Sequence, residues 1–432
     1  MADIAFVRQT MLPPEDAPGS AVGPVRWARE NLFAGPFNAL LTLVAAAFVV
    51  WLVMAIAPWF LHSVWNANSL AECRQIIAAT WGEGAHGACF AVIHQRWNQF
   101  LFGFYPQELY WRPTLAFLLM LVAMAPVLFQ HLPRRMIWFT LAFPGVAYWL
   151  LWGGSAFLPI AIYAGFAVGA LVYRLVFQRL SSGLLPGLLA MLACLLWWIY
   201  LAGPVAALLG DVLALTPVSS KQFGGFMLSL TIGVTGIAFS LPLGILLALG
   251  RRSDMYLVKA MSVGFIEFIR GVPLITLLLV ASFLLNIFLP PGTNFDIILR
   301  VIIMVTLFAS AYMAEVIRGG LAALPKGQYE AADALGLDYP KAMRLVIMPQ
   351  ALKISIPSIV NTFIDLFKDT TLVAIIGLLD PIGLTTAIRA DAAWNGLIWE
   401  LYGFVALMFF ICCFGMSKYS QYLERKLRTD HR

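Results

Sequence analysis

The stretch that decides the fold is EVIRGGLAALPKGQYEAADALGLDYPKAMRLVIMP, residues 315–349, a charged segment lying between two long apolar stretches. Within it, residues 329–335 favour a helix, and Gly336 can take the left-handed conformation that ends one. Tyr339 and Pro340 then open a second short helix. The segment alone leaves two interpretations open, a loop that docks onto a cytoplasmic partner and an ordinary solvated helical hairpin.

The rest of the chain has the composition of a membrane protein. Of its 432 residues, 61% are hydrophobic and only 12% are charged, which is far from the soluble average. Apolar windows of about 20 residues, the length that crosses a bilayer, predict an all-α polytopic protein with about ten transmembrane helices. The windows are 38–61, 114–130, 136–152, 156–178, 184–209, 225–250, 258–289, 297–317, 352–378 and 397–416.

The distribution of Lys and Arg predicts the orientation of these spans. With a cytoplasmic N-terminus, roughly twenty of them fall on the inner side and roughly six outside, so both termini and the 318–353 loop are expected in the cytoplasm. The net charge of +6 follows from this bias and does not indicate nucleic acid. Residues 1–36 lack the apolar stretch of a cleavable signal peptide, so the first span is expected to act as an uncleaved anchor.

The loop carries a recognisable motif. Glu330, Ala331, Ala332 and Gly336, followed by Val346-Ile347-Met348-Pro349 where the family has Ile-x-Leu-Pro, resemble the EAA loop of permease subunits of binding-protein-dependent ABC importers. The departures, Val for Ile and Met for Leu before the proline, keep apolar side chains. Four ordered blocks resemble the polar-amino-acid branch of these permeases, and they are 224–253, 266–279, 311–337 and 361–380.

The large N-terminal extension resembles the M-type permeases of general L-amino-acid importers, the AapM/BztC kind. The resemblance implies a five-helix type I ABC importer permease core after a multi-span extension. The expected parts are a cytoplasmic tail at 1–37, a transmembrane extension at 38–221 with an extracytoplasmic loop at 62–113, the core at 222–420 with its coupling loop at 318–353, and a basic cytoplasmic tail at 421–432.

The same resemblance implies the function and the partners. The chain is expected to form half of an amino-acid pathway in a bacterial inner membrane, beside a homologous and non-identical second permease, an ATPase dimer and a periplasmic amino-acid-binding protein. It has no G-x-x-x-x-G-K-[ST] loop and no hydrolase motif, so it is expected to be no enzyme, with ATP and Mg²⁺ bound by the separate ATPase. The residues expected to contact that ATPase are Glu330, Ala331, Ala332, Leu335, Gly336 and Pro349.

One predicted span is unusually polar at its centre. An amino acid presents an ammonium and a carboxylate, so Asp365 or Asp369 is a candidate for the first and Lys368 for the second, with hydrogen bonds from Asn361, Thr362 and the following threonines. The alternative is that this polar segment fixes helix packing and the gate. The full set is Asn361, Thr362, Asp365, Lys368, Asp369, Thr370 and Thr371.

Charged residues within spans also form three local pairs. Each pair is spaced i, i+3, so its members share a helix face and can neutralise one another. Glu267–Arg270 and Glu315–Arg318 lie toward the predicted cytoplasmic ends, where a structural or gating role is expected. The third pair is Asp365–Lys368.

Two cysteines fall in the expected extracytoplasmic loop. Cys73 and Cys89 are candidates for a disulfide in an oxidising compartment, and the alternative that they stay unpaired remains open. A metal site from Cys89, His86 and His94 is disfavoured because the spacing is irregular. Two further functions remain as alternatives, an ion-gradient-driven secondary transporter and a non-transporting scaffold or channel, although no inverted repeat supports the first.

Overall fold

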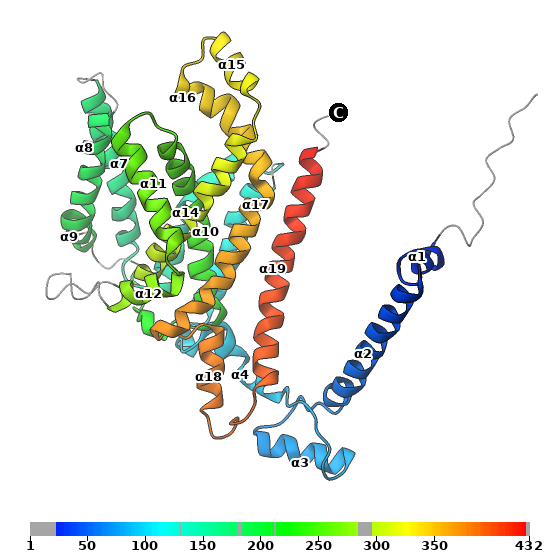
Figure 1. Cartoon of the computed structure of the whole chain (residues 1–432). Helices are drawn as coiled ribbons and strands as arrows, with labels where there is room; N and C mark the ends of the chain where they lie inside the picture. The colour runs from blue at the N-terminus through cyan, green and yellow to red at the C-terminus, as the bar shows by residue number, and fades with distance from the viewer. Residues whose placement is uncertain are drawn as a thin grey trace, which may run out of the picture. The chain divides into compact units, whose positions relative to one another are not determined.

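The regular structure of the chain is helical. The computed structural model describes residues 23–129, 131–178, 184–208, 210, 213–283 and 296–428, and Figure 1 shows them as helices joined by short connections. They divide into two compact units, residues 1–92 and 93–432. Parts of four expectations lie outside the described residues, namely most of the 1–37 tail, the end of the 258–289 window, part of the segment near 211 and the last four residues of the basic tail.

The first unit holds one long apolar helix and a small folded loop. Helix α1 spans Pro24–Asn31, α2 spans Pro36–Leu61 and α3 spans Leu70–Trp81. No residue of α2 is buried within the chain, although it is the most apolar of the candidate spans. A helix that is hydrophobic all round and uncovered by its own chain has the properties of a membrane span.

The second unit is a helical bundle. Its N-terminal part contains α4 (Ala91–Phe102, which begins in the first unit), α5 (Trp111–Leu128), α6 (Ile137–Trp152), α7 (Phe157–Phe177), α8 (Leu184–Leu196) and α9 (Ala202–Leu208). Its C-terminal part contains α10 (Gly225–Arg251), α11 (Tyr256–Gly271), α12 (Leu274–Phe283), α14 (Ile297–Ala322), α15 (Lys326–Ala334), α16 (Tyr339–Ala342), α17 (Met348–Asp369), α18 (Pro381–Arg389) and α19 (Trp399–Arg428).

The number of spans is lower by strict criteria than the ten expected. Among the described residues, seven helices are long and apolar enough to cross a membrane, or eight if the bent pair α11 and α12 counts as one span. Helix α6, at 16 residues, and α17, with its polar centre, are not among them, so ten is not confirmed.

The apolar window at 258–289 is divided into two helices at a sharp bend. Helices α11 and α12 meet at 100°, with Val272 and Pro273 between them. Proline lacks the backbone N–H that would continue the helical ladder, and it disfavours helical geometry at the residue before it. Pro242, by contrast, lies inside an unbroken α10.

The main hydrophobic cluster does not stop at the boundary expected near residue 221. It joins Tyr105, Ala116 and Leu151 of the N-terminal part to Leu228 and Val305 of the C-terminal part. Helices α5 and α6 are therefore packed as part of the core bundle.

Polar contacts join the same two parts. Arg112, which is buried, donates to the backbone carbonyl of Thr216 at 2.7 Å and to its hydroxyl at 2.6 Å. The Trp152 indole donates to Ser220 at 2.7 Å, and Ser220 donates to Asp296, the residue that caps α14. Thr216 and Ser220, which precede α10, are thus held by hydrogen bonds to both parts.

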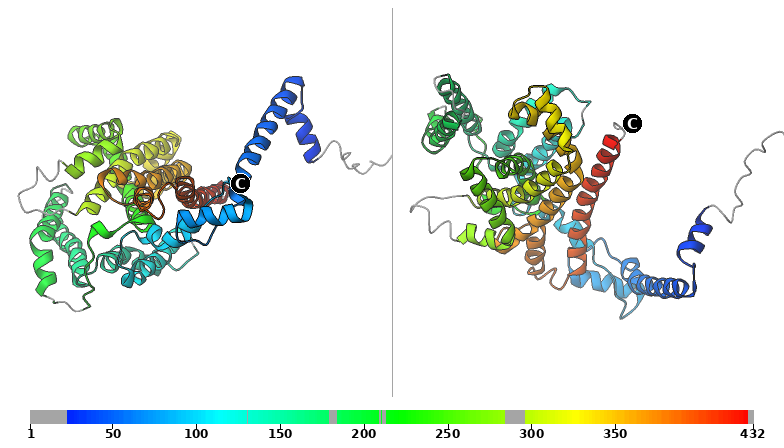
Figure 2. Two further views of the ribbon diagram at one scale, coloured as in Figure 1. Left: turned by 90° about the horizontal axis from the view of Figure 1, so that it is seen from below. Right: turned by 45° about the horizontal axis from the view of Figure 1, so that its top comes forward.

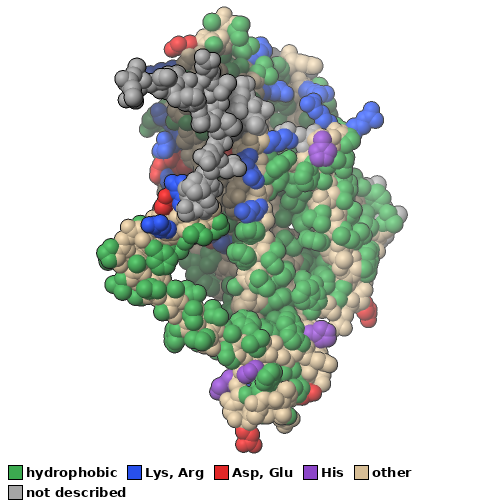
Figure 3. Space-filling view, turned by 90° about the vertical axis from the view of Figure 1, so that its right-hand side faces the viewer, with side chains coloured by type: hydrophobic (Ala, Val, Ile, Leu, Met, Phe, Trp, Pro, Cys, Tyr) green, Lys and Arg blue, Asp and Glu red, His purple; other side chains and the backbone are tan. Residues whose placement is uncertain are grey.

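The C-terminal helices form a second cluster toward the α15 end of the bundle. It includes Ala248 of α10, Ile317 of α14 and Ile347, just before α17. Figure 2 shows α10, α14 and α17 grouped together, with α7 and α8 at the edge of the bundle. Hydrophobic side chains cover much of the face drawn in Figure 3, as expected for a protein surrounded by lipid.

Candidate functional site

Helix α15 ends in the motif that the sequence predicts. Gly336 has φ +72°, its N–H donates to the carbonyl of Asp333 at 2.9 Å, and the N–H of Leu337 donates to the carbonyl of Ala332 at 3.1 Å. These two bonds are those of a Schellman motif, in which a left-handed residue satisfies the last carbonyls of a helix. Gly336 therefore sets the direction in which the chain leaves α15 toward α16, as Figure 1 shows.

The outer face of α15 is available to a partner. Glu330 and Ala331 are exposed, and Leu335 at the tip is 77% exposed. Pro349 is also exposed, at the start of α17. Ala332 is only 1% exposed within its own chain, so it is less accessible to a partner than Glu330 and Ala331. It lies on the opposite face of the short helix and packs within its own chain.

Side-chain contacts hold α15 against the bundle, and one of them is the 3.4 Å hydrogen bond that the Tyr329 hydroxyl donates to the carbonyl of Leu321 on α14. Gln350 on α17 donates to the side chain of Gln328 at 3.0 Å. On the other side, Arg252 at the end of α10 donates to the Tyr329 hydroxyl at 3.0 Å, and its guanidinium lies 5.5 Å from the centre of that ring. Helix α15 is therefore attached to α10, α14 and α17.

Helix α16 is capped by the residue that precedes it. The Asp338 carboxylate accepts from the backbone N–H of Lys341 and from its ammonium, both at 3.1 Å. These hydrogen bonds from Lys341 hold the pKa of Asp338 below its ordinary value.

The charged side chains near this end pair differently from the expectation. Glu267 binds Arg251 of α10 at 2.9 Å, and Arg270 faces Glu315 at 3.8 Å, so the predicted Glu267–Arg270 pair is wrong. Both side chains of α11 pair with neighbouring helices instead, Glu267 with α10 and Arg270 with α14. The Glu315–Arg318 pair, at 2.9 Å, is present as predicted.

Glu315 is the centre of this group. It is only 16% exposed, and besides Arg318 and Arg270 it accepts from Arg251 at 2.7 Å. We call Arg251, Glu267, Arg270, Glu315 and Arg318 the ion-pair cluster. It joins the ends of α10, α11 and α14.

A pocket of about 220 Å³ lies between α14 and α17. Its polar lining comes from Asp365, Asp369 and Thr362, and two aromatic rings, Phe308 and Tyr312, form the side contributed by α14. On α17 the lining positions are spaced by three and four residues, so they share one helix face. The arrangement offers two carboxylates and apolar walls, which suit an ammonium group attached to a small organic molecule.

Several polar residues of the same segment do not line this pocket. Asn361 is exposed elsewhere on α17, and Lys368 binds Asp365 at 2.9 Å, as its i, i+3 spacing predicts. Thr370 is fully buried and donates to the carbonyl of Phe367 at 2.7 Å, so its hydroxyl does not face the pocket. Thr371 likewise donates within the helix, to the carbonyl of Lys368.

Comparison with known proteins shows the family of the chain. Residues 240–429 match the model of the family described as binding-protein-dependent transport system inner membrane component. Over its full length the chain is 61% identical to the glutamate/glutamine/aspartate/asparagine transport system permease protein BztC of Rhodobacter capsulatus, which is also covered in full. The chain belongs to this family.

Other relatives of the permease match different lengths of its chain. It is 41% identical to the inner membrane amino-acid ABC transporter permease protein YhdY of Escherichia coli, over 96% of each chain. It is 31% identical to the probable glutamine ABC transporter permease protein GlnM of Bacillus subtilis, over 49% of this chain and 95% of that one. About half of this permease therefore has no counterpart in the shorter relative.

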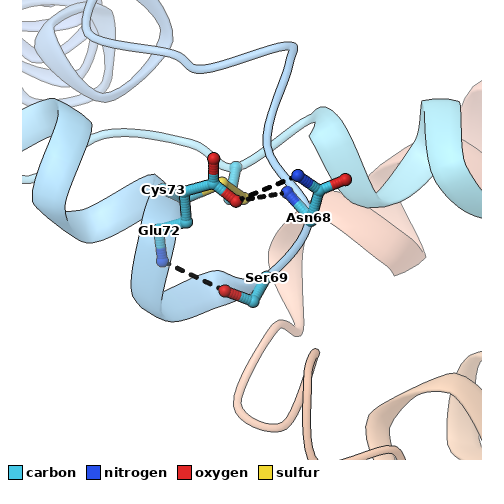
Figure 4. Close-up of a disulfide and its surroundings, with 5 residues drawn as sticks. Asn68, Ser69, Glu72 and Cys73 are labelled. Atoms are coloured by element: carbon cyan, nitrogen blue, oxygen red, sulfur yellow. Dashed lines mark hydrogen bonds between the residues drawn. A yellow bond between two sulfur atoms is a disulfide. The ribbon is translucent and has the colours of Figure 1, made fainter.

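The loop of the first unit is closed covalently. Cys73 and Cys89 form a disulfide, and both are buried (Figure 4). Beside it, Ser69 caps α3 by accepting from the N–H of Glu72 at 3.2 Å, and the Glu72 carboxylate accepts from the N–H of Asn68 at 2.8 Å. The sulfur of Cys89 is consumed in the bond, so it is no thiolate ligand. Among the described residues, no three His, Cys, Asp or Glu side chains are grouped to hold a metal ion.

Sequence reasoning does not single out Arg251, Arg252, Tyr312 and Tyr329, which make contacts between helices near α15 and the pocket. The two adjacent arginines at the end of an apolar helix were the available signal.

Proposed function

We propose that this permease forms half of the pathway of an ATP-driven importer of L-amino acids, and that it receives the force of ATP hydrolysis through α15. The observation that carries the proposal is the exposed outer face of α15, fixed in direction by Gly336 and attached to the long helices by Tyr329 and Gln328. The full-length similarity to BztC makes glutamate, glutamine, aspartate and asparagine the first substrates to test.

The pocket between α14 and α17 is the proposed site for the substrate's ammonium group. Asp365 and Asp369 supply carboxylates there, and Phe308 and Tyr312 supply apolar contact. Lys368, already paired with Asp365, is not among the lining residues, so the substrate carboxylate is proposed to bind elsewhere, on the second permease.

The proposed complex contains four kinds of chain. A separate ATPase dimer binds ATP and Mg²⁺, a periplasmic binding protein delivers the amino acid, and a second, non-identical permease completes the pathway. We propose that the α15 end of the bundle faces the cytoplasm together with the end of α19. Both lie at the same end in Figure 1, and both carry basic residues.

Import by the reconstituted complex tests the proposal. Proteoliposomes with the binding protein, both permeases and the ATPase are loaded with ATP, and uptake of labelled glutamate is measured for the parent, Asp365→Asn and Asp369→Asn. Loss of one charged hydrogen bond, about 1.5–3 kcal/mol, predicts a rise of roughly ten- to a hundredfold in the half-saturating ligand concentration for at least one of the variants. Glu424→Gln, near the end of α19, is the control. Unchanged uptake in both pocket variants would refute the assignment of the pocket.

A further inference from the structure

The last turn of α10 ends in two adjacent arginines that bind different elements. Arg251 donates to Glu315 of α14 at 2.7 Å and to Glu267 of α11 at 2.9 Å. Arg252 donates to the Tyr329 hydroxyl of α15 at 3.0 Å. Because the two residues are consecutive, α15 is connected through one peptide unit to the ion-pair cluster.

The ion-pair cluster in turn reaches the pocket. The guanidinium of Arg270 lies 3.8 Å from Glu315 on one side, and 5.7 Å from the centre of the Tyr312 ring on the other. Tyr312 is one of the residues that line the pocket. A continuous series of polar contacts therefore leads from α15 through α10 and α11 to the pocket wall on α14.

Charge and burial single out Arg251 within the cluster. The cluster has three arginines and two carboxylates, and Glu315 is its most buried member, so the attraction is concentrated on that carboxylate. Arg318 binds the same carboxylate from its own helix, three residues away. Among the three arginines, only Arg251 contacts carboxylates on two other helices, whereas Arg318 adds no connection between helices.

We infer that Arg251 and Arg252 are positioning residues that transmit a displacement of α15 to α11 and α14, and thereby to the pocket. The inference rests on the proposed function and adds the route. In this conformation the cluster holds the ends of α10, α11 and α14 together, so they move as one body when α15 is displaced. Loss of the Arg251 contacts with the ion-pair cluster, or of the Arg252 contact with Tyr329, leaves ATP hydrolysis intact but uncouples it from amino-acid import.

Two pairs of matched variants test the route. Arg251→Gln and Arg318→Gln each remove one positively charged partner of the Glu315 carboxylate, but only Arg251→Gln breaks the contact between α10 and α14. Arg252→Ala is matched with Lys259→Ala, which removes an exposed charge nearby on α11. Tyr329→Phe keeps the ring and removes only the hydroxyl. For each variant, the number of labelled amino acids imported per ATP hydrolysed is measured in proteoliposomes, and assembly with the ATPase is checked.

The expected result is a fall of at least fivefold in amino acids imported per ATP for Arg251→Gln and Arg252→Ala, with less than a twofold change for Arg318→Gln and Lys259→Ala. The effects of Tyr329→Phe and Arg252→Ala are expected to be less than additive, because both remove the Arg252–Tyr329 hydrogen bond, and Tyr329→Phe removes in addition only the long hydrogen bond from the Tyr329 hydroxyl to the Leu321 carbonyl. Equal effects of Arg251→Gln and Arg318→Gln, or full additivity of the combined variant, would overturn the route. If the parent complex itself shows no import stimulated by the binding protein, the proposed function fails instead.

Discussion

The left-handed glycine at the end of α15 leads to a quantitative prediction. Gly336→Ala forces a residue with a side chain into φ +72°. Nothing lies within 4 Å of the position that its Cβ would take, so there is no steric clash and only the backbone conformation is strained. Left-handed geometry is less favourable by about 1–2 kcal/mol for a residue with a Cβ.

This strain favours local opening of the turn that follows α15. A loss of about 1 kcal/mol makes the open state roughly fivefold more populated, since 1.4 kcal/mol corresponds to a factor of ten. The N–H groups of Gly336 and Leu337, bonded to Asp333 and Ala332, report on that opening. Their hydrogen exchange should therefore be about fivefold faster in Gly336→Ala, and less accelerated in Gly336→Asn, because asparagine tolerates this conformation better.

Hydrogen exchange followed by mass spectrometry over residues 330–340 measures the effect. Gly327→Ala is the matched control, because Gly327 lies within the first turn of α15, has no positive φ and also has open space around it. Alanine there favours the helix by about 0.5–1 kcal/mol, so exchange should slow or stay unchanged. Equal exchange in Gly336→Ala and the parent would refute the argument that Gly336 fixes the turn.

Three further predictions follow from other contacts. If the disulfide forms, denatured protein that has not been reduced should expose three reactive thiols, from Cys194, Cys412 and Cys413, and reduction should raise the number to five. Loss of the disulfide in Cys73→Ser should lower the stability of the first unit by about 3 kcal/mol, measured as faster proteolysis of residues 62–92. Arg112→Ala should lower the apparent melting temperature in detergent, since it removes two hydrogen bonds of a buried charge worth about 1.5–3 kcal/mol each, whereas Arg134→Ala should not. Asp380 lies outside the candidate spans, and burial raises the pKa of its carboxyl group to about 6. Its contribution to the free energy of unfolding is therefore greatest below pH 4 and falls as the pH rises toward 6. Melting curves of Asp380→Asn should lack this part of the parent's pH dependence.

Local features of the fold could be predicted from sequence because each depends on a few neighbouring residues. Gly336 ends α15 because a residue in the left-handed conformation completes the last hydrogen bonds of the helix. The Asp365–Lys368 pair forms within a single helix. These are properties of short segments, which carry their own geometry.

Features that depend on packing between helices could not be predicted. The choice of Arg251 rather than Arg270 as the partner of Glu267 is set by how α10 lies against α11. The burial of Ala332 depends on the orientation of α15, and the face of α17 that lines the pocket depends on α14. The same is true of Arg112, which closes the packing between the N-terminal and C-terminal parts.

The most direct test of the central claim is ATPase binding and stimulated turnover in proteoliposomes that hold the complete complex and the binding protein. Glu330→Arg and Leu335→Glu change the exposed face of α15, and Ala322→Ser, an exposed position at the end of α14, is the control. The account predicts that ligand-loaded binding protein stimulates the parent and the control, and that both α15 variants lose the ATPase or its stimulation. Normal assembly and stimulated turnover in both α15 variants would contradict it, and α15 would then be only a solvated helix.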